Sequence, residues 1–164
     1  MTRADKTRRN FIFIAIAFTY VISYFHRAAP AVVGPIIAGE LGLSPAELGA
    51  IGSAYFWAYA LAALPSGLLA DTWGARRTIA AFVLVAAVGG VVFALSGGVV
   101  SLVASRFLIG LGVGVVYVAA MRIFSDWYAP DELATLAGVL LAVGNVGASL
   151  STSPLVTVIG AAGW

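Results

Sequence analysis

Two arginines lie within long apolar stretches of the sequence, where a charged side chain is costly. Arg27 falls inside residues 11–38 and Arg106 inside residues 99–121, and neither stretch contains Asp or Glu. An unpaired charge at such a position costs about 3 kcal/mol or more unless it faces a partner or a cavity. The planar fork of arginine binds a carboxylate or phosphate at two points and keeps its charge when dehydrated. The pattern predicts an anion-binding pair. The alternative is that each arginine pairs with an acid elsewhere and only holds the protein together.

Helix geometry places the two arginines at a similar level. At about 1.5 Å per residue, Arg27 lies roughly 24 Å from the start of its stretch, and Arg106 lies roughly 10 Å from the start of its own. If the first stretch starts on the inner side of a membrane and the other on the outer side, both arginines fall in the outer half. Two like charges at one level repel each other unless an anion lies between them. We therefore expect Arg27 and Arg106 to line one cavity and to bind its ligand jointly.

Tyr24 and His26 lie beside Arg27 and complete the expected substrate-binding group. His26 is the only histidine in the sequence, and no other side chain titrates near neutral pH. It could exchange a proton during function, or it could serve only in packing and hydrogen bonding.

The composition excludes several classes of site. The sequence is 62% hydrophobic and 10% charged, and it has no cysteine. Disulfides and cysteine-ligated zinc or iron–sulfur sites are therefore excluded, and one histidine cannot supply a typical metal site. No basic stripe with interleaved aromatic residues predicts nucleic-acid binding. The only lysine, Lys6, lies outside the apolar stretches, so an intramembrane Ser–Lys pair is unavailable. We expect no enzyme activity, no metal and no cofactor.

The apolar stretches have the length of membrane-spanning helices, which need about 20 residues. Five are predicted, at about residues 11–38, 48–70, 78–96, 99–121 and 134–159. Pro30 and Pro35 could kink the first, and Pro65 and Pro154 could kink the second and the fifth. The sequence thus predicts an all-α membrane protein with five transmembrane helices. Residues 1–10 form a basic N-terminal segment, and residues 11–164 form the bundle.

Basic residues outside the apolar stretches fall on one side of the predicted membrane. The loops around residues 39–47 and 97–98 carry none. The alternate side carries seven, which are Arg3, Lys6, Arg8, Arg9, Arg76, Arg77 and Arg122. Because Lys and Arg are enriched in cytoplasmic loops, we expect a cytoplasmic N-terminus in the plasma (inner) membrane. Residues 7–12 also resemble a twin-arginine export signal, but four further apolar stretches favour a basic flank before a spanning helix.

Two short segments carry glycines with a structural purpose. Residues 67–77, between the second and third stretches, begin with Gly67, which permits close helix approach. Gly74 permits a sharp turn, and Asp71 lies at a helix end, where it can accept from arginine or free N–H groups. Arg76 and Arg77 then hold this loop on the cytoplasmic side, although an ordinary basic loop would look similar.

The other glycine segment lies in the fourth stretch. Gly110 and Gly114 have GxxxG spacing, which is typical of a helix-packing face. A dinucleotide-binding loop is excluded, because no strand precedes these glycines.

Residues 67–77 resemble the signature loop between helices two and three of the major facilitator superfamily. That loop reads Gly-x-Leu-x-Asp-(Arg/Lys)-x-Gly-(Arg/Lys)-(Arg/Lys). Five positions from Gly67 to Arg76 match it in place, whereas Thr72 and Ala75 replace two basic residues. Residues 105–114 likewise resemble the helix-four motif, in which a glycine-rich run follows an arginine. The resemblance implies an incomplete N-terminal six-helix half of the major facilitator fold and makes the 67–77 loop a conformational or gating motif.

Arg27 and Arg106 match arginines of one branch in particular, the anion:cation symporters and the organophosphate antiporters. Proton-coupled members often carry Asp immediately before the helix-one arginine, where this sequence has His26. Many also carry a carboxylate or glutamine in the helix-four glycine run, where this sequence has Gly112 and Val113. The usual proton acceptors are therefore missing.

The resemblance implies secondary active transport of a small organic anion, with symport and alternating access between two helix bundles. The expected partners are the anion, the lipid bilayer and either the remainder of a longer transporter or a second chain. Two alternatives remain. One is a non-transporting membrane scaffold or interaction subunit, which oligomerisation through Gly110 and Gly114 would support. The other is an inactive truncated fragment.

Overall fold

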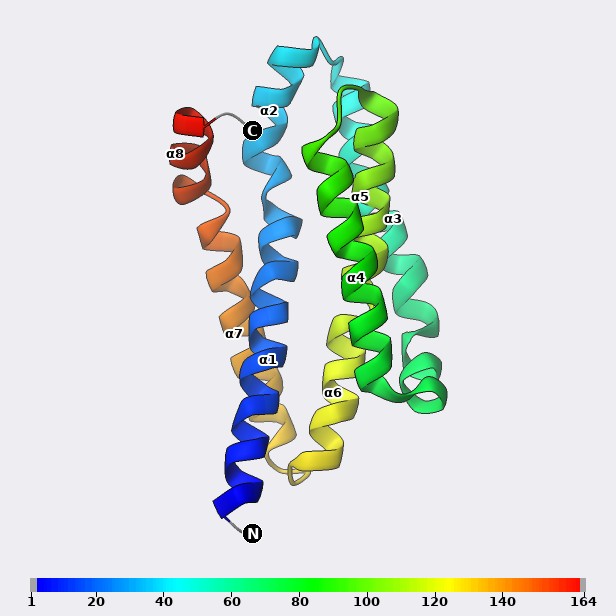
Figure 1. Ribbon diagram of the computed structural model, residues 1–164, viewed down its shortest axis with the longest axis vertical. Coiled ribbons are helices and arrows are strands. Elements are labelled where there is room, and N and C mark those ends of the chain that lie inside the picture. The colour runs from blue at the N-terminus through cyan, green and yellow to red at the C-terminus, as the bar shows by residue number, and fades with distance from the viewer. Residues whose placement is uncertain (1–2, 163–164) are drawn as a thin grey trace.

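The computed structural model describes residues 3–162 as a sequence of helices joined by short turns (Figure 1). In chain order these are α1 (Arg3–Ala28), α2 (Pro30–Leu41), α3 (Pro45–Leu69), the π-helical turn η1 (Ala70–Gly74), α4 (Ala75–Ala94), α5 (Val99–Gly114), α6 (Val116–Trp127), α7 (Leu133–Leu150) and α8 (Ser153–Ala162). No strand occurs within residues 3–162, and the predicted all-α class is confirmed.

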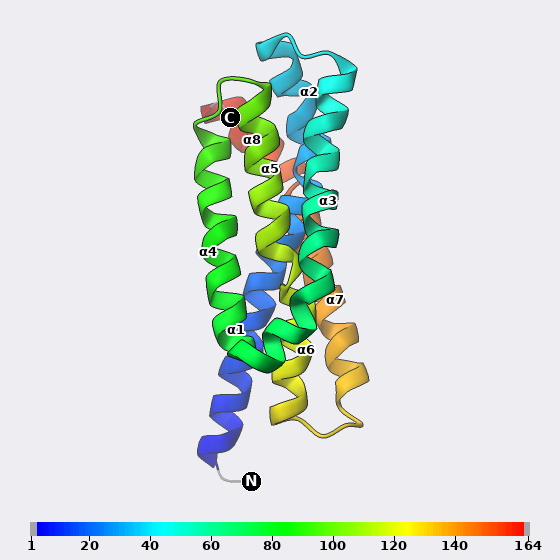
Figure 2. The same ribbon diagram turned by 90° about the vertical axis from the view of Figure 1, so that its right-hand side faces the viewer.

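The helices form five passes along the long axis. Within the described residues, four helical stretches are long and apolar enough to cross a membrane: Asp5–Ala28, Pro45–Ala94, Val99–Trp127 and Leu133–Ile159. The second contains 50 residues, more than twice what one crossing needs, and it folds back at η1 so that α3 and α4 run antiparallel (Figure 2). Gly74 permits this reversal, because its φ of 94° lies in the region that favours glycine.

Two of the breaks within a pass occur at prolines. The first pass divides into α1 and α2 at Ala29, immediately before Pro30, and the last divides into α7 and α8 just before Pro154. Pro35 and Pro65 instead lie inside α2 and α3 without ending them. The fourth pass divides at Val115, a break that the sequence did not predict.

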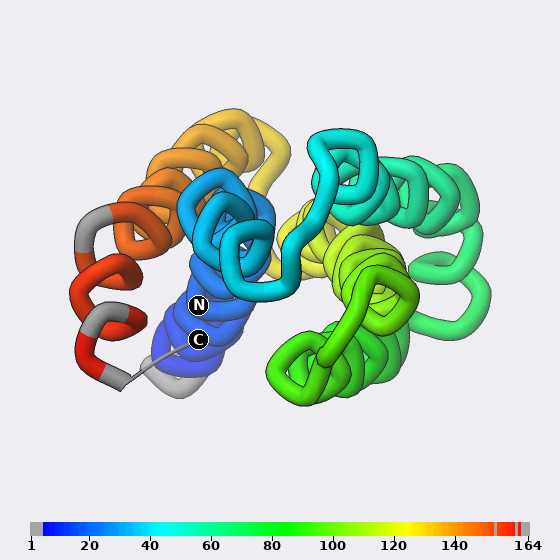
Figure 3. The backbone as a smooth tube through the Cα atoms, turned by 90° about the horizontal axis from the view of Figure 1, so that it is seen from above, coloured from blue at the N-terminus to red at the C-terminus, as the bar shows by residue number. Residues whose placement is uncertain are grey.

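The passes form two groups when the molecule is seen along its long axis (Figure 3). In one group α1 packs against α7. In the other, α5 packs against both α3 and α4. Glycines permit these close approaches. A Cβ atom on Gly110 would overlap the backbone of Tyr55 on α3, and one on Gly147 would overlap the backbone of Val21 on α1.

Large apolar side chains cover the outside of the bundle. Leu64 and Val100 are each 84% exposed, and Phe11 is 72% exposed. Water does not solvate such a surface favourably, whereas lipid does. This chain is therefore an integral membrane protein.

Candidate functional site

Arg106 of α5 is buried, with 3% of its surface exposed. Its Nη1 atom donates a hydrogen bond to the backbone oxygen of His26 at 2.9 Å, and its guanidinium carbon lies 4.6 Å from the centre of the Tyr55 ring. The buried Nε atom has no hydrogen-bond partner among the described residues. No carboxylate within residues 3–162 forms an ion pair with Arg106. The charge is therefore only partly compensated, by one carbonyl and one aromatic face.

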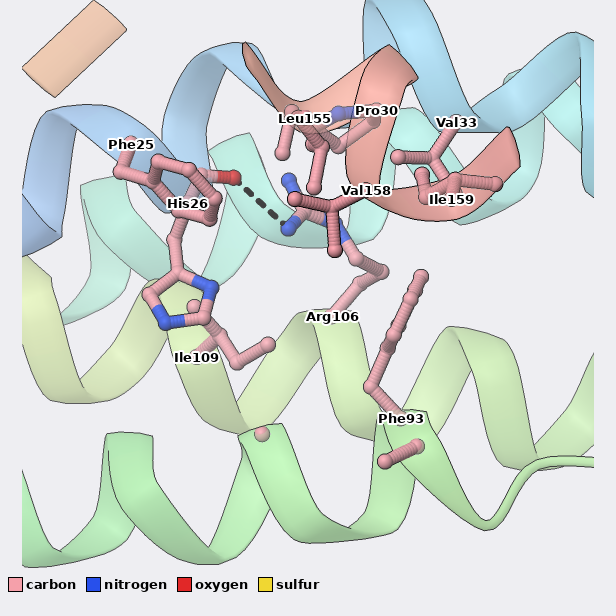
Figure 4. A pocket seen from close by; sticks show the side chains of 13 residues that line it. Phe25, His26, Pro30, Val33, Phe93, Arg106, Ile109, Leu155, Val158 and Ile159 are labelled. Carbon is pink, nitrogen blue, oxygen red and sulfur yellow. Dashed lines mark hydrogen bonds between the residues drawn. The ribbon is translucent and has the colours of Figure 1, made fainter. Parts of the chain in front are cut away.

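A cavity of about 280 Å³ lies beside this arginine (Figure 4). Its walls come from α1, α2, α4, α5 and α8, together with Ala29 between α1 and α2. His26 and Arg106 are the only side chains among the described lining residues that can hydrogen-bond, and the rest are apolar. An anion in this cavity would meet one positive charge among apolar side chains, where electrostatic attraction is stronger than in water.

Arg27 does not line this cavity, contrary to the expectation that both arginines share one. Its side chain is exposed, and its guanidinium carbon lies 5.8 Å from the ring centres of both Tyr24 and Phe56. The physical reason is helical rotation: successive residues of a helix point about 100° apart, so His26 and Arg27 face different neighbours.

The two arginines nevertheless lie at a similar level. Arg106 contacts Tyr55, which is 1% exposed, and Arg27 contacts the next residue of α3, Phe56, which is 53% exposed. The expected shared depth therefore agrees with the structure, but the two charges approach α3 on different faces. Tyr24 lies with Arg27 rather than with the cavity.

The 67–77 motif forms the hairpin between α3 and α4, and Asp71 lies in η1. The Oδ1 atom of Asp71 accepts a hydrogen bond from Nε of Arg122 at 2.8 Å, and Arg122 also pairs with Asp126. The buried hydroxyl of Thr78 donates to the carbonyls of Leu69 and Gly74, each at 3.1 Å, and so joins the two ends of the hairpin.

Sequence reasoning missed Arg122 as the partner of Asp71, because it counted this arginine only as a topological charge. Its spacing of four residues from Asp126 was a local signal for one of its two ion pairs. Arg76 and Arg77 form no ion pair with an acid of the described residues.

Close helix contacts were expected at Gly110 and Gly114 and at Gly67, and the structure has them only at the first two. The Gly110 and Gly114 face packs against α3 of the same chain, where a Cβ atom on Gly114 would lie 2.8 Å from the carbonyl oxygen of Tyr59. This face is thus occupied within the monomer. A Cβ atom on Gly67, in contrast, would make only an ordinary contact of 4.0 Å with Val118. Packing in this conformation does not require glycine at position 67.

A second cluster fixes the start of α1 to the turn between α6 and α7. Arg9 forms an ion pair with Glu132 at 3.4 Å, and its guanidinium carbon lies 4.6 Å from the Tyr128 ring centre. The Tyr128 hydroxyl donates to the carbonyl of Arg9 at 3.1 Å, and burial raises the pKa of Tyr128. The basic segment therefore continues α1 as a helix from residue 3 instead of forming a separate tail.

Three curated relatives are transporters. The chain is 29% identical over 164 residues to the probable sulfoacetate transporter SauU of Cupriavidus necator, covering all of this chain and 38% of that protein. It is 30% identical over 142 residues to the hexuronate transporter of Bacillus subtilis, covering 87% of this chain and 33% of that protein. It is 29% identical over 154 residues to the D-galactonate transporter of Escherichia coli O6:H1, covering 93% of this chain and 36% of that protein. The chain thus spans about a third of the length of these relatives.

A solved structure has the same fold. It is the crystal structure of a bacterial homolog to the human lysosomal transporter Spinster, in an inward-facing and unoccupied conformation. The TM-score is 0.82 at 22% sequence identity, over 92% of this chain and 31% of that one.

The relatives also confirm the predicted likeness to the anion:cation symporter branch. The sequence pattern of the Major Facilitator Superfamily matches residues 16–164, and the chain therefore belongs to this family.

Proposed function

We propose that this chain is part of a carrier that moves a small organic anion across the membrane by alternating access. The observation that carries the proposal is Arg106, a buried arginine without an acidic partner among the described residues and with an unsatisfied Nε atom. Such a charge gains more from an incoming carboxylate than an already paired one would. His26 lines the same cavity and contributes a ring that can donate or accept a hydrogen bond.

Arg27 and Tyr24 take part from the neighbouring face of α1. Arg27 contacts α3 at the same level as Arg106 does. Both Arg27 and Tyr24 lie outside the cavity that Arg106 lines. In an alternating-access carrier the helix bundles rock relative to each other around the binding site, which can bring such faces toward one ligand. Symport with a cation belongs to the same proposal.

The substrates named for the relatives support a small carboxylate or sulfonate as the anion. Sulfoacetate, hexuronates and galactonate are small anions that carry a carboxylate, a sulfonate or both, and their transporters resemble this chain. A carboxylate or sulfonate matches the two-point fork of arginine. The remaining parts of the transport pathway come from the rest of a longer transporter or from a second chain.

The scaffold alternative receives less support. It depended on association through Gly110 and Gly114, and that face packs against α3 within the chain.

Binding of sulfoacetate, glucuronate and galactonate to the purified protein tests the proposal. Arg106→Lys and Arg27→Lys keep the charge but lose the planar fork, so each should weaken binding by about tenfold or more. Arg8→Lys is the matched control, because Arg8 lies at the start of α1 near Trp127, and it should leave affinity unchanged. If both lysine variants bind as the unchanged protein does but melt at a lower temperature, the arginines are structural and the substrate class loses its support.

A further inference from the structure

The carbonyl that accepts the hydrogen bond of Arg106 belongs to His26, four residues before Pro30. In an α-helix the carbonyl of residue 26 accepts from the N–H of residue 30, but Pro30 has no N–H to donate. Neighbouring positions keep the helical pattern, since the N–H of Ala29 donates to Phe25 and that of Val33 donates to Ala29, both at 2.9 Å. The break between α1 and α2 therefore leaves the His26 oxygen without its helical donor.

Arg106 supplies the donor that Pro30 lacks. Its Nη1 atom lies 2.9 Å from the His26 oxygen, across 80 residues of sequence. Figure 4 shows this bond among the side chains that line the cavity, which include Pro30 and, from α8, Leu155 and Val158. With the Tyr55 ring 4.6 Å away, two contacts hold the plane of the guanidinium group.

The remaining donors of the guanidinium group stay available. An arginine has five N–H donors, and within the described residues a single hydrogen bond, the one to His26, is found for Arg106. The buried Nε atom has no partner there. A group held by one hydrogen bond and one aromatic ring, with further donors unused in an apolar cavity, is arranged to receive an anion with little loss of side-chain entropy.

We propose that Pro30 is a positioning residue for Arg106. By removing the helical donor from the His26 carbonyl, Pro30 creates the anchor that orients the guanidinium group toward the cavity. This role deepens the proposed function and rests on it, because Arg106 is the residue there assigned to the anion. Pro30 itself need not touch the ligand.

Pro30→Ala tests this role, because alanine restores an N–H that can donate to His26 and displace Arg106. Galactonate and sulfoacetate should bind about fivefold more weakly. The melting temperature should not fall by more than it does in Pro35→Ala, the matched control on the same pass. Pro35 lies outside the cavity lining, so its substitution should leave affinity unchanged. Unchanged affinity in Pro30→Ala overturns the inference.

The second arm separates the missing N–H from the rigid ring. Incorporation of lactic acid at position 30 replaces the amide with an ester, which removes the ring but adds no N–H. Affinity should remain within about twofold of the unchanged protein. A loss as large as that of Pro30→Ala would show that the ring matters, and it would overturn the inference.

A double-mutant cycle with Arg106→Gln decides the case even without a bound anion. If Pro30 acts through Arg106, Pro30→Ala should change the melting temperature differently in the Arg106→Gln background than alone. Additive changes in melting temperature overturn the positioning role. A failure of the unchanged protein to bind any of the probe anions counts against the proposed function alone, because the cycle in melting temperature still tests Pro30.

Discussion

Arg106 combines deep burial with incomplete compensation of its charge. Arginine stays charged even when dehydrated, so the free-energy cost of burying its charge is not avoided by loss of a proton. One carbonyl and one tyrosine ring offset only part of that cost. A residue of this kind either stabilises the fold weakly or binds an anion strongly, and the lysine variants described above separate the two roles.

Asp71 differs from Arg106 because both partners of its ion pair are exposed at one end of the bundle. The pair joins η1 to α6, two elements that must move together or separate if the bundle rearranges. Its contribution to stability is small, because solvent screens exposed ion pairs. Its role in the protein is therefore expected to be conformational.

Asp71→Asn should slow transport by about twofold to fivefold with little change in substrate affinity. Arg122→Gln should slow transport to a similar extent. The variant with both substitutions should be no slower than either single variant, because each substitution removes the ion pair between Asp71 and Arg122. Asp126→Asn is the control, since it leaves the pair between Asp71 and Arg122 in place. Initial rates and affinities measured in proteoliposomes check this. A large loss of affinity with normal turnover would show that Asp71 contacts the substrate.

At the scale of the helices, glycine determines which surfaces approach each other. Gly110 and Gly114 of α5 face α3, while Gly112, on another side of α5, faces Phe82 and Ala86 of α4. In lipid the association of helices depends on close packing, because lipid tails are as apolar as the side chains. The α5 helix therefore lies between α3 and α4 because small residues allow approach on two sides.

Gly110→Ala should destabilise the protein by about 1–3 kcal/mol, because the added methyl group would force α5 away from the Tyr55 backbone. Gly52→Ala is the matched control in α3. A Cβ atom added at Gly52 would have no atom of a neighbouring segment within 4 Å, and alanine favours the helix. Thermal unfolding in detergent, with both variants in parallel, measures the difference. Equal melting temperatures for the two variants would contradict the close contact between α3 and α5.

At the scale of the whole molecule, the two ends of α3 should lie on opposite sides of the membrane. The helix contains 25 residues, which corresponds to about 37 Å and exceeds the hydrocarbon thickness. Ser44 forms a capping box with Glu47, so Ser44 itself is a poor position for a probe. Ala46 and Thr72 are both exposed and lie near the two ends.

Because the sequence has no cysteine, Ala46→Cys and Thr72→Cys can each be labelled without background. A membrane-impermeant maleimide added to intact cells should label Cys at position 46 and should label position 72 only after the membrane is opened. The distribution of basic residues is the reason for this expectation. The reverse pattern would place the N-terminus outside and overturn the proposed orientation.

The amino-acid sequence by itself determined the helical class, the order of the passes, the reversal at Gly74, the tight face at Gly110 and Gly114, and the family. These features are local: hydropathy, a glycine at a turn and the spacing of small residues can all be read along one segment. Tertiary structure alone decided that Arg106 reaches the carbonyl of His26, that Arg122 reaches Asp71, and that Arg27 faces away from the cavity. These contacts depend on how each helix is rotated about its axis. In α5, which carries Arg106 and is apolar nearly all round, no amphipathic pattern records that rotation.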